Sequence, residues 1–210
     1  MFVALLLQFG RAQETPPPSY YRPNQQVSID DLPSVKAQSK DAGAVLLAAV
    51  QTVLHDKDLC CGRDSALVDE VASADPSSLQ SLSLKLQGRQ HLSDGRPVMV
   101  TAEYLAPSAI GSGEIVGSLR SQHALLMLWN AHVYVLYGAT FDETYDGSGA
   151  MVYAIRKLLL LDPRFSGKRR AVSFNRDTDD FGKVQGMLLL TTAPPLGRSK
   201  QEAVIKIVGS

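Results

Sequence analysis

The stretch of residues 123–138, HALLMLWNAHVYVLYG, limits the possible folds of this chain most strongly, because it holds two apolar runs around a short break. The runs cover residues 125–129 and 133–137. They are rich in aliphatic and aromatic side chains, and the turn-forming residues Asn130 and Gly138 bound them. Short apolar runs of this kind are typical of buried β-strands. The second run begins with His132, so we expect an imidazole at the start of a central strand.

Helical periodicity dominates the chain before this stretch. Apolar residues recur at three- and four-residue spacing over residues 45–54, with Asp41 as the expected N-cap. Similar patterns predict helices after Gly62, after Ser77 or Ser78, and from Ser112. Further strands are expected at residues 98–104, 153–161 and 184–192. Residues 141–149 are expected in the hairpin connection before the strand at 153–161, and the highly charged residues 164–183 in a loop. Because helices come first and strands second, the predicted class is α+β with an antiparallel sheet.

Composition divides the chain into four segments. Residues 1–13 contain a short apolar run that suits a secretory signal peptide and predicts a secreted or periplasmic protein. No basic residue precedes this run, so a misplaced start codon or an ordinary buried strand stays an open alternative. Residues 14–39 begin with a proline-rich stretch and are expected to form an arm or linker. The predicted domain covers residues 40–193, and residues 194–210 form a tail.

Charge and cysteine content exclude several classes of partner. The 21 Lys and Arg residues balance the 21 Asp and Glu residues, so the chain has no net positive charge that would attract nucleic acid or an anionic membrane. No apolar run is long enough for an ordinary membrane-spanning helix, and we expect no membrane span in the mature chain. The two cysteines are adjacent, which excludes a conventional disulfide framework. The cysteines and histidines lack the paired spacings of a zinc site, so we expect no metal and no cofactor.

Cysteine, histidine and aspartate follow one another in an order that suits thiol catalysis. Cys61 is expected at the start of a helix, where the helix dipole and free N–H groups stabilise a thiolate. His132 begins one strand and Asp162 ends another, so an antiparallel sheet can place both at the same edge. The hypothesis is that Cys61 attacks a carbonyl carbon, His132 takes its proton, and Asp162 orients the imidazole. Cys60 is the alternative nucleophile.

Each of these residues also has an ordinary structural explanation. A cysteine is often a small buried hydrophobe, and the adjacent pair could instead close a strained vicinal disulfide. His132 could be a core histidine with satisfied hydrogen bonds. Asp162, which precedes a proline, could simply end a strand in a turn. The agreement of all three residues in one order is what favours the catalytic interpretation.

These motifs together resemble the papain-like cysteine peptidases, and most closely the bacterial branch that includes bacteriocin-processing peptidases. The resemblance covers about residues 40–192. It rests on Cys-Gly opening a helix at Cys61, on an apolar strand that begins at His132 and ends in Tyr-Gly, and on Asp-Pro at Asp162. It implies N-terminal helices packed on a C-terminal antiparallel sheet, a triad of Cys61, His132 and Asp162, and a peptide or protein substrate.

One departure from the family concerns the oxyanion. The family usually carries a Gln about six residues before the nucleophile, but His55 occupies that position here and the nearest Gln is Gln51. His55 and Gln51 are the candidate oxyanion donors, and backbone N–H groups are the alternative. The first functional hypothesis is therefore a secreted thiol hydrolase that cleaves a peptide or related amide bond. The missing Gln motivates the alternative, a papain-fold protein without catalysis that binds peptides or has a structural role.

Overall fold

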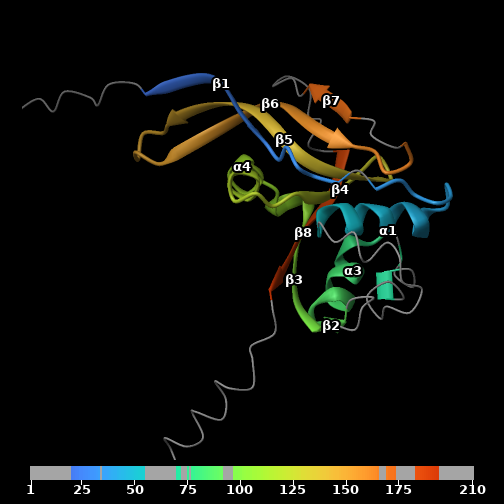
Figure 1. The fold of residues 1–210 in the computed structure, drawn as a ribbon. Coiled ribbons are helices and arrows are strands. Elements are labelled where there is room, and N and C mark those ends of the chain that lie inside the picture. Colours follow the sequence, from blue (N-terminus) through green and yellow to red (C-terminus); the bar gives the residue numbers. More distant parts are fainter. Residues whose placement is uncertain are drawn as a thin grey trace, which may run out of the picture.

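The computed structural model describes residues 20–33, 35–54, 70–71, 75, 77–91, 97–165, 169–173 and 183–193. Within these residues, three helices pack against an eight-stranded antiparallel sheet, which confirms the predicted mixture of helices with an antiparallel sheet (Figure 1). The elements in chain order are β1 (Tyr21–Ser28), α1 (Ala42–Val53), α3 (Leu79–Leu86), β2 (Gly88–His91), β3 (Pro97–Leu105), the 3₁₀ turn η2 (Pro107–Ala109), α4 (Ser112–Arg120), β4 (Leu125–Trp129), β5 (His132–Tyr145), β6 (Met151–Leu161), β7 (Arg169–Ser173) and β8 (Val184–Ala193).

Strand β5 is the centre of the sheet, because three other strands share its two edges. Strand β6 pairs with one edge over residues 135–145. On the other edge, β4 pairs with residues 132–136 and β1 pairs with residues 138–144. The full strand order is β2-β3-β8-β4-β5-β6-β7, with β1 joined to β5 outside this path. The apolar run that begins at His132 therefore lies in the interior of the sheet, as its composition predicts.

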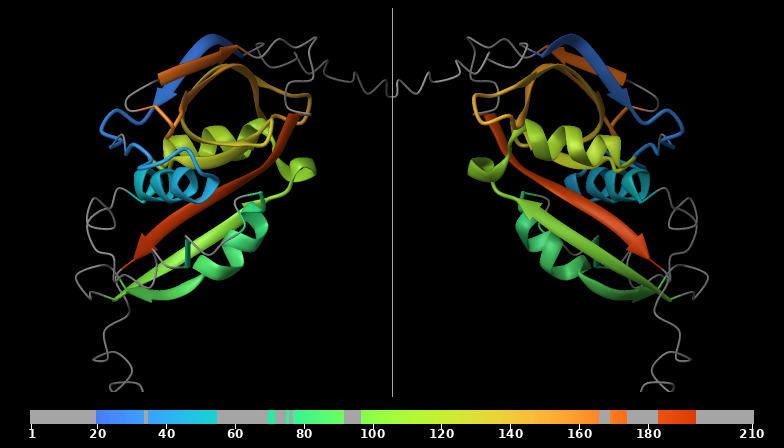
Figure 2. Two further views of the ribbon diagram at one scale, coloured as in Figure 1. Left: turned by 90° about the vertical axis from the view of Figure 1, so that its right-hand side faces the viewer. Right: turned by 90° about the vertical axis from the view of Figure 1, so that its left-hand side faces the viewer.

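The helices cover different parts of this sheet. Helix α1 packs against β4 and β5, whereas α3 packs against β3 and β8, and α4 packs against β6, β1 and β5 (Figure 2). The predicted N-caps are confirmed for two helices: Asp41 accepts a hydrogen bond from the backbone N–H of Ala44 at 2.8 Å, and Ser78 accepts one from Ser81 at 3.1 Å. These bonds satisfy N–H groups that a helix leaves without intrahelical partners, so both helices begin where their sequences indicate.

Three polar strands were missing from the sequence prediction, and one of them is the short strand β2 that directly follows α3. Residues 21–28, expected in an arm, form β1, and the adjoining Ile29 and Leu32 are buried in the core, so this part of the chain belongs to the folded unit. Residues 169–173, expected in a charged loop, form β7. Strand β5 also continues to Tyr145 through residues that were expected in a hairpin turn. The expected signal peptide, the tail and most of the helix after Gly62 lie outside the described residues.

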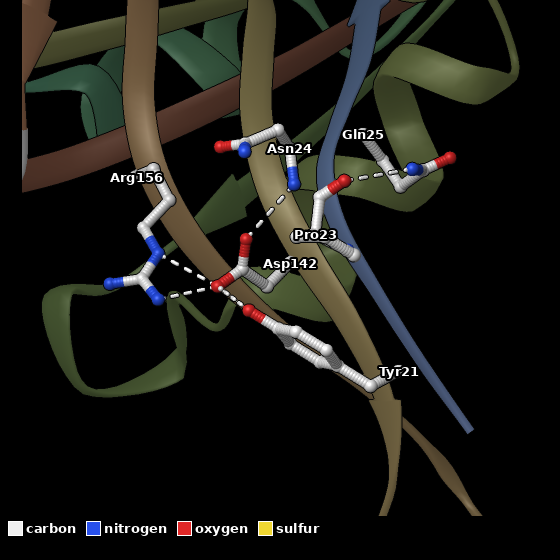
Figure 3. A network of polar contacts seen from close by, with 6 residues as sticks. All are labelled: Tyr21, Pro23, Asn24, Gln25, Asp142 and Arg156. Carbon is white, nitrogen blue, oxygen red and sulfur yellow. Dashed lines mark hydrogen bonds and ion pairs between the residues drawn. The ribbon is translucent and has the colours of Figure 1, made fainter. Parts of the chain in front are cut away.

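Buried charge fastens β1 to the sheet. Asp142 on β5 is only 3% exposed, and it accepts hydrogen bonds from the side chains of Arg156 and Tyr21 and from the backbone N–H of Asn24 (Figure 3). The bonds from Arg156 contribute most to lowering the pKa of Asp142, and those from Asn24 and Tyr21 add to the effect. Asp142 thus links β6 and β1 through one carboxylate. This link holds β1 on the sheet although β1 has no buried apolar side chain.

Gly138 occupies the point on β5 where β1 ends and β4 begins. A Cβ atom at this position would lie 2.9 Å from the carbonyl oxygen of Val27 and 2.9 Å from a methyl carbon of Leu159. Next to this point, the backbone N–H of Ile29 donates to the carbonyl of Tyr137 at 2.9 Å as the chain leaves the sheet. Only a residue without a side chain fits this close approach of three chain segments.

We predict that Gly138→Ala lowers the free energy of unfolding by roughly 1–3 kcal/mol, because the added methyl group must displace the backbone of β1 and the partly buried side chain of Leu159. Urea unfolding of the purified chain, followed by circular dichroism, measures the change. Gly147→Ala is the matched control, since no atom lies within 4 Å of a Cβ built there. Equal unfolding midpoints for the two variants would contradict this account of Gly138.

Candidate functional site

A cavity of about 360 Å³ lies where the first turn of α1 meets the β4–β5 hairpin and the turn after β6. Helix α1 and the residue before its N-cap contribute Lys40, Ala42 and Val45 to its walls, while the hairpin contributes His132 and the turn contributes Arg164. The rest of the described lining consists of Ser77, Leu128, Ala131, Val133 and Gln185. The cavity thus combines apolar walls with a few polar groups, which is typical of ligand-binding pockets.

The β4–β5 hairpin fixes the position of His132. Its two turn residues, Asn130 and Ala131, both have positive φ angles, of 49° and 58°, as a two-residue type I′ turn requires. The backbone N–H of Ala131 donates to the side-chain oxygen of Gln185 on β8 at 2.7 Å. Trp129 and His132 are then directly paired across the hairpin. The predicted break at Asn130 is confirmed, and it places His132 on the cavity wall.

His132 is not a buried core histidine. The residue is exposed, and its side chain makes no hydrogen bond or ion pair with the part of the chain that the structure describes. Its ring nitrogens are therefore available to a ligand or to a nucleophile. This observation removes one of the ordinary explanations for the residue.

Asp162 is held by Arg164 and not by His132. The Asp162 carboxylate is 2% exposed, and it accepts hydrogen bonds from the Arg164 backbone N–H at 3.1 Å, from Nε at 2.8 Å and from Nη2 at 2.7 Å. Burial alone raises the pKa of Asp162, but the hydrogen bonds and positive charge of Arg164 outweigh it, with help from Arg170, so the pKa is lowered. No hydrogen bond joins Asp162 to His132.

The turn after β6 also organises the entrance to α1. The backbone N–H of Ala37 donates to the carbonyl of Pro163 at 2.9 Å, which ties the segment before α1 to this turn. Arg164 Nη2 donates further to the hydroxyl of Tyr134 on β5 at 3.3 Å. These contacts bring Lys40 and Arg164 to the walls of one cavity, although they are far apart in sequence. Neither residue was among the sequence candidates, and the only available signal for Arg164 was its position two residues after an aspartate at a strand end.

The structure brings together some of the sequence candidates. Strands β5 and β6 are antiparallel neighbours, with Val135 opposite Leu161, so His132 and Asp162 lie at the same end of the two strands as expected. The helix end beside them is the start of α1, where the residues are Ala42, Gly43, Ala44 and Val45. Cys60, Cys61 and His55 lie outside the described residues.

Gln51 lies away from the cavity beside His132. Gln51 was a candidate oxyanion donor near His132, but it lies in the last turn of α1, about 13 Å along the helix axis from Ala42. The cavity lies at the opposite end of this helix, and Gln51 does not line it. The structure therefore does not bring Gln51 to the His132 site, because counting residues back from the cysteines does not show which end of α1 meets β5.

Comparisons of the chain with protein-family models, with curated proteins and with solved structures found no significant match. The helices within the described ranges include none that is both long and apolar enough to cross a membrane. The function of the chain must therefore be inferred from the cavity itself.

The Asp162–Arg164 pair makes stability depend on pH in a defined direction. Because the pKa of Asp162 is lowered in the folded state, its stabilising effect is complete above the unfolded pKa of about 4 and disappears as the pH falls through the folded value. We predict that Asp162→Asn lowers the free energy of unfolding by about 2 kcal/mol at neutral pH. This difference from the wild type should shrink near pH 3.

Urea unfolding at pH 7 and pH 3 measures the two differences. Asp31→Asn, which changes an exposed aspartate, is the control for a general loss of negative charge. An Asp162→Asn effect of the same size at both pH values would contradict the ion-pair explanation.

Proposed function

We propose that this chain is a papain-like domain that binds a peptide in the cavity beside His132 and does not hydrolyse it. The observation that carries the proposal is the composition of the helix end at this cavity. In the papain-like arrangement inferred from the sequence, a thiol at a helix N-terminus meets the catalytic histidine. Among the described residues, the helix end that shares the cavity with His132 is the start of α1, which carries only alanine, glycine and valine in its first residues.

The pairing of Asp162 supports the same proposal. A catalytic imidazole needs an acceptor that holds its second nitrogen, and the hypothesis assigned this role to Asp162. All the hydrogen bonds that the Asp162 carboxylate accepts come from Arg164 instead. A carboxylate that is fixed in this way supports the turn and the cavity wall, and it leaves the imidazole free to contact a ligand.

The walls of the cavity suit a peptide. Val45, Leu128 and Val133 offer apolar surface for a side chain, while Ser77 and Gln185 offer hydrogen-bonding groups for a backbone. The resemblance of the motif order in the sequence to papain-like peptidases agrees with a peptide ligand. The export that residues 1–13 predict would place this binding activity in a secreted or periplasmic protein.

Filling the cavity should abolish peptide binding. We predict that Ala42→Trp reduces the retention of N-acetylated tetrapeptides at least about tenfold, because the indole occupies space that the ligand needs. Pooled tetrapeptides are incubated with the purified full chain, separated by size exclusion and identified by mass spectrometry. Ala150→Trp, at an exposed alanine in the β5–β6 turn, is the matched control. Failure of the wild-type chain to retain any peptide would overturn the proposal.

Hydrolysis by a thiol is the second candidate function, and the free imidazole of His132 is the observation that favours it. In this mechanism Cys61 attacks an amide carbonyl carbon, and His132 takes the thiol proton and returns it to the leaving amine. Water then attacks the thioester and releases the acid and the free thiol. Cys60 is the alternative nucleophile.

Thiol reactivity separates the two functions. Under the binding proposal, iodoacetamide at about pH 6 should label the cysteines no faster than free cysteine, because no imidazole activates them. The rates are measured by mass spectrometry on the wild type, Cys60→Ala, Cys61→Ala and His132→Ala. Accelerated labelling that both Cys61→Ala and His132→Ala abolish would favour the hydrolase instead. Loss in Cys60→Ala would assign the nucleophile to Cys60.

A further inference from the structure

The cavity beside His132 is lined by cationic side chains and by no described carboxylate. The cationic side chains are Lys40 and Arg164, which line the walls together with His132, whereas the described lining contains neither Asp nor Glu. The nearby Asp162 binds Arg164 without itself lining the cavity. Asp41, next to Lys40, is the cap of α1 and accepts a hydrogen bond from Ala44. A ligand in the cavity therefore meets positive charge.

Arg164 is held in one orientation with part of its guanidinium unused. Nε and Nη2 donate to Asp162, and Nη2 donates also to Tyr134. The guanidinium lies 5.8 Å from the ring centroids of both Tyr134 and Phe165. Nη1 makes no hydrogen bond with the described residues, and the side chain is 22% exposed at the cavity. Its N–H groups are thus pre-organised for an acceptor that enters from the cavity.

Lys40 supplies a second donor on the same cavity. The residue is exposed, and its ammonium group makes no ion pair with the part of the chain that the structure describes. An ammonium group and a fixed guanidinium can bind the two oxygens of one carboxylate, since hydrogen bonds between charged groups are about twice as strong as neutral ones. His132 can add a third donor on the same side of the ligand.

We propose that this cavity recognises a carboxylate of its peptide ligand, through Nη1 of Arg164 and the ammonium group of Lys40. The inference rests on the proposed peptide binding and names the group that is recognised. Two sources supply the same chemistry: the C-terminal carboxylate of a peptide and the side chain of Asp or Glu. Burial of Asp162 behind Arg164 serves this role, because it orients the guanidinium toward the ligand.

Three matched pools of N-acetylated tetrapeptides test the inference on the full chain. The first pool contains neutral residues with a free C-terminal carboxylate, the second has the same sequences as C-terminal amides, and the third is amidated with one Glu in each peptide. We expect the wild-type chain to retain the first or the third pool at least about tenfold more than the second. Preference for the first pool assigns a peptide C-terminus, and preference for the third assigns an acidic side chain.

Variants connect this preference to the two residues. Lys40→Gln, at an exposed position, should reduce the preference several-fold without affecting folding. Arg164→Gln leaves the buried Asp162 without its partner, so the double variant Asp162→Asn with Arg164→Gln is measured beside it, each checked by thermal unfolding. Lys36→Gln and Arg89→Gln remove one positive charge each at exposed positions outside the cavity lining, and both should keep the wild-type preference.

The outcomes separate the inference from the proposed function. Equal retention of all three pools would overturn carboxylate recognition and leave peptide binding intact. If no pool is retained, peptide binding is overturned. Nuclear magnetic resonance with N-acetylglycine and N-acetylglycinamide then tests whether the cavity still recognises a carboxylate. A shift of the Arg164 Nε–H signal with the acid alone would support carboxylate recognition and refute peptide binding, whereas no shift with either compound would overturn both.

Discussion

The two-sided pairing of β5 is the constraint on which the rest of the structure depends. A strand that shares its edges with β4, β1 and β6 cannot shift by one residue, because a shift would turn every side chain to the other face and break three ladders at once. This fixed register places His132 at one end of the strand and Asp142 toward the other. It also explains why Gly138 stands between the β1 and β4 partners, where a side chain would collide with both the backbone of β1 and the partly buried Leu159.

Buried carboxylates paired with arginines recur around this strand. Asp142 pairs with Arg156, Glu143 with Arg120, and Asp162 with Arg164, and in each pair the acid is buried while the arginine is partly exposed. Such pairs add little net stability compared with apolar packing, but they are costly to break because the remaining partner stays desolvated. They therefore fix particular geometries. The pair at Asp142 fastens an exposed strand to the sheet, and the pair at Asp162 shapes the wall of the cavity.

The sequence was sufficient to predict those elements whose formation depends on their own side chains. The apolar runs of β4, β8 and the first half of β5 are largely buried on both faces, and β6 ends in an apolar run that is mostly buried. The caps Asp41 and Ser78 mark two helices by local hydrogen bonds. Strands β1, β2 and β7 could not be predicted in this way, because polar edge strands owe their structure to the backbone of a neighbour. The role of Arg164 could not be predicted for a related reason. An ion pair between residues two apart in sequence depends on the conformation of the turn, and hydrophobic periodicity does not predict that conformation.

The turn after β6, in which Asp162 has a structural role, also contributes the guanidinium of Arg164 to the cavity wall. If Asp162 faced His132, Arg164 would lack a buried partner and its guanidinium would be free to rotate into solvent. Because the carboxylate instead holds Nε and Nη2, the remaining nitrogen is presented on a fixed fork beside Lys40 and His132. Under the proposed function, the pairing of Asp162 with Arg164 serves the recognition of an anionic ligand and not proton transfer by His132. His132, which makes no hydrogen bond with the described residues, would then be one donor among three around that ligand, and this role requires no thiol at the start of α1.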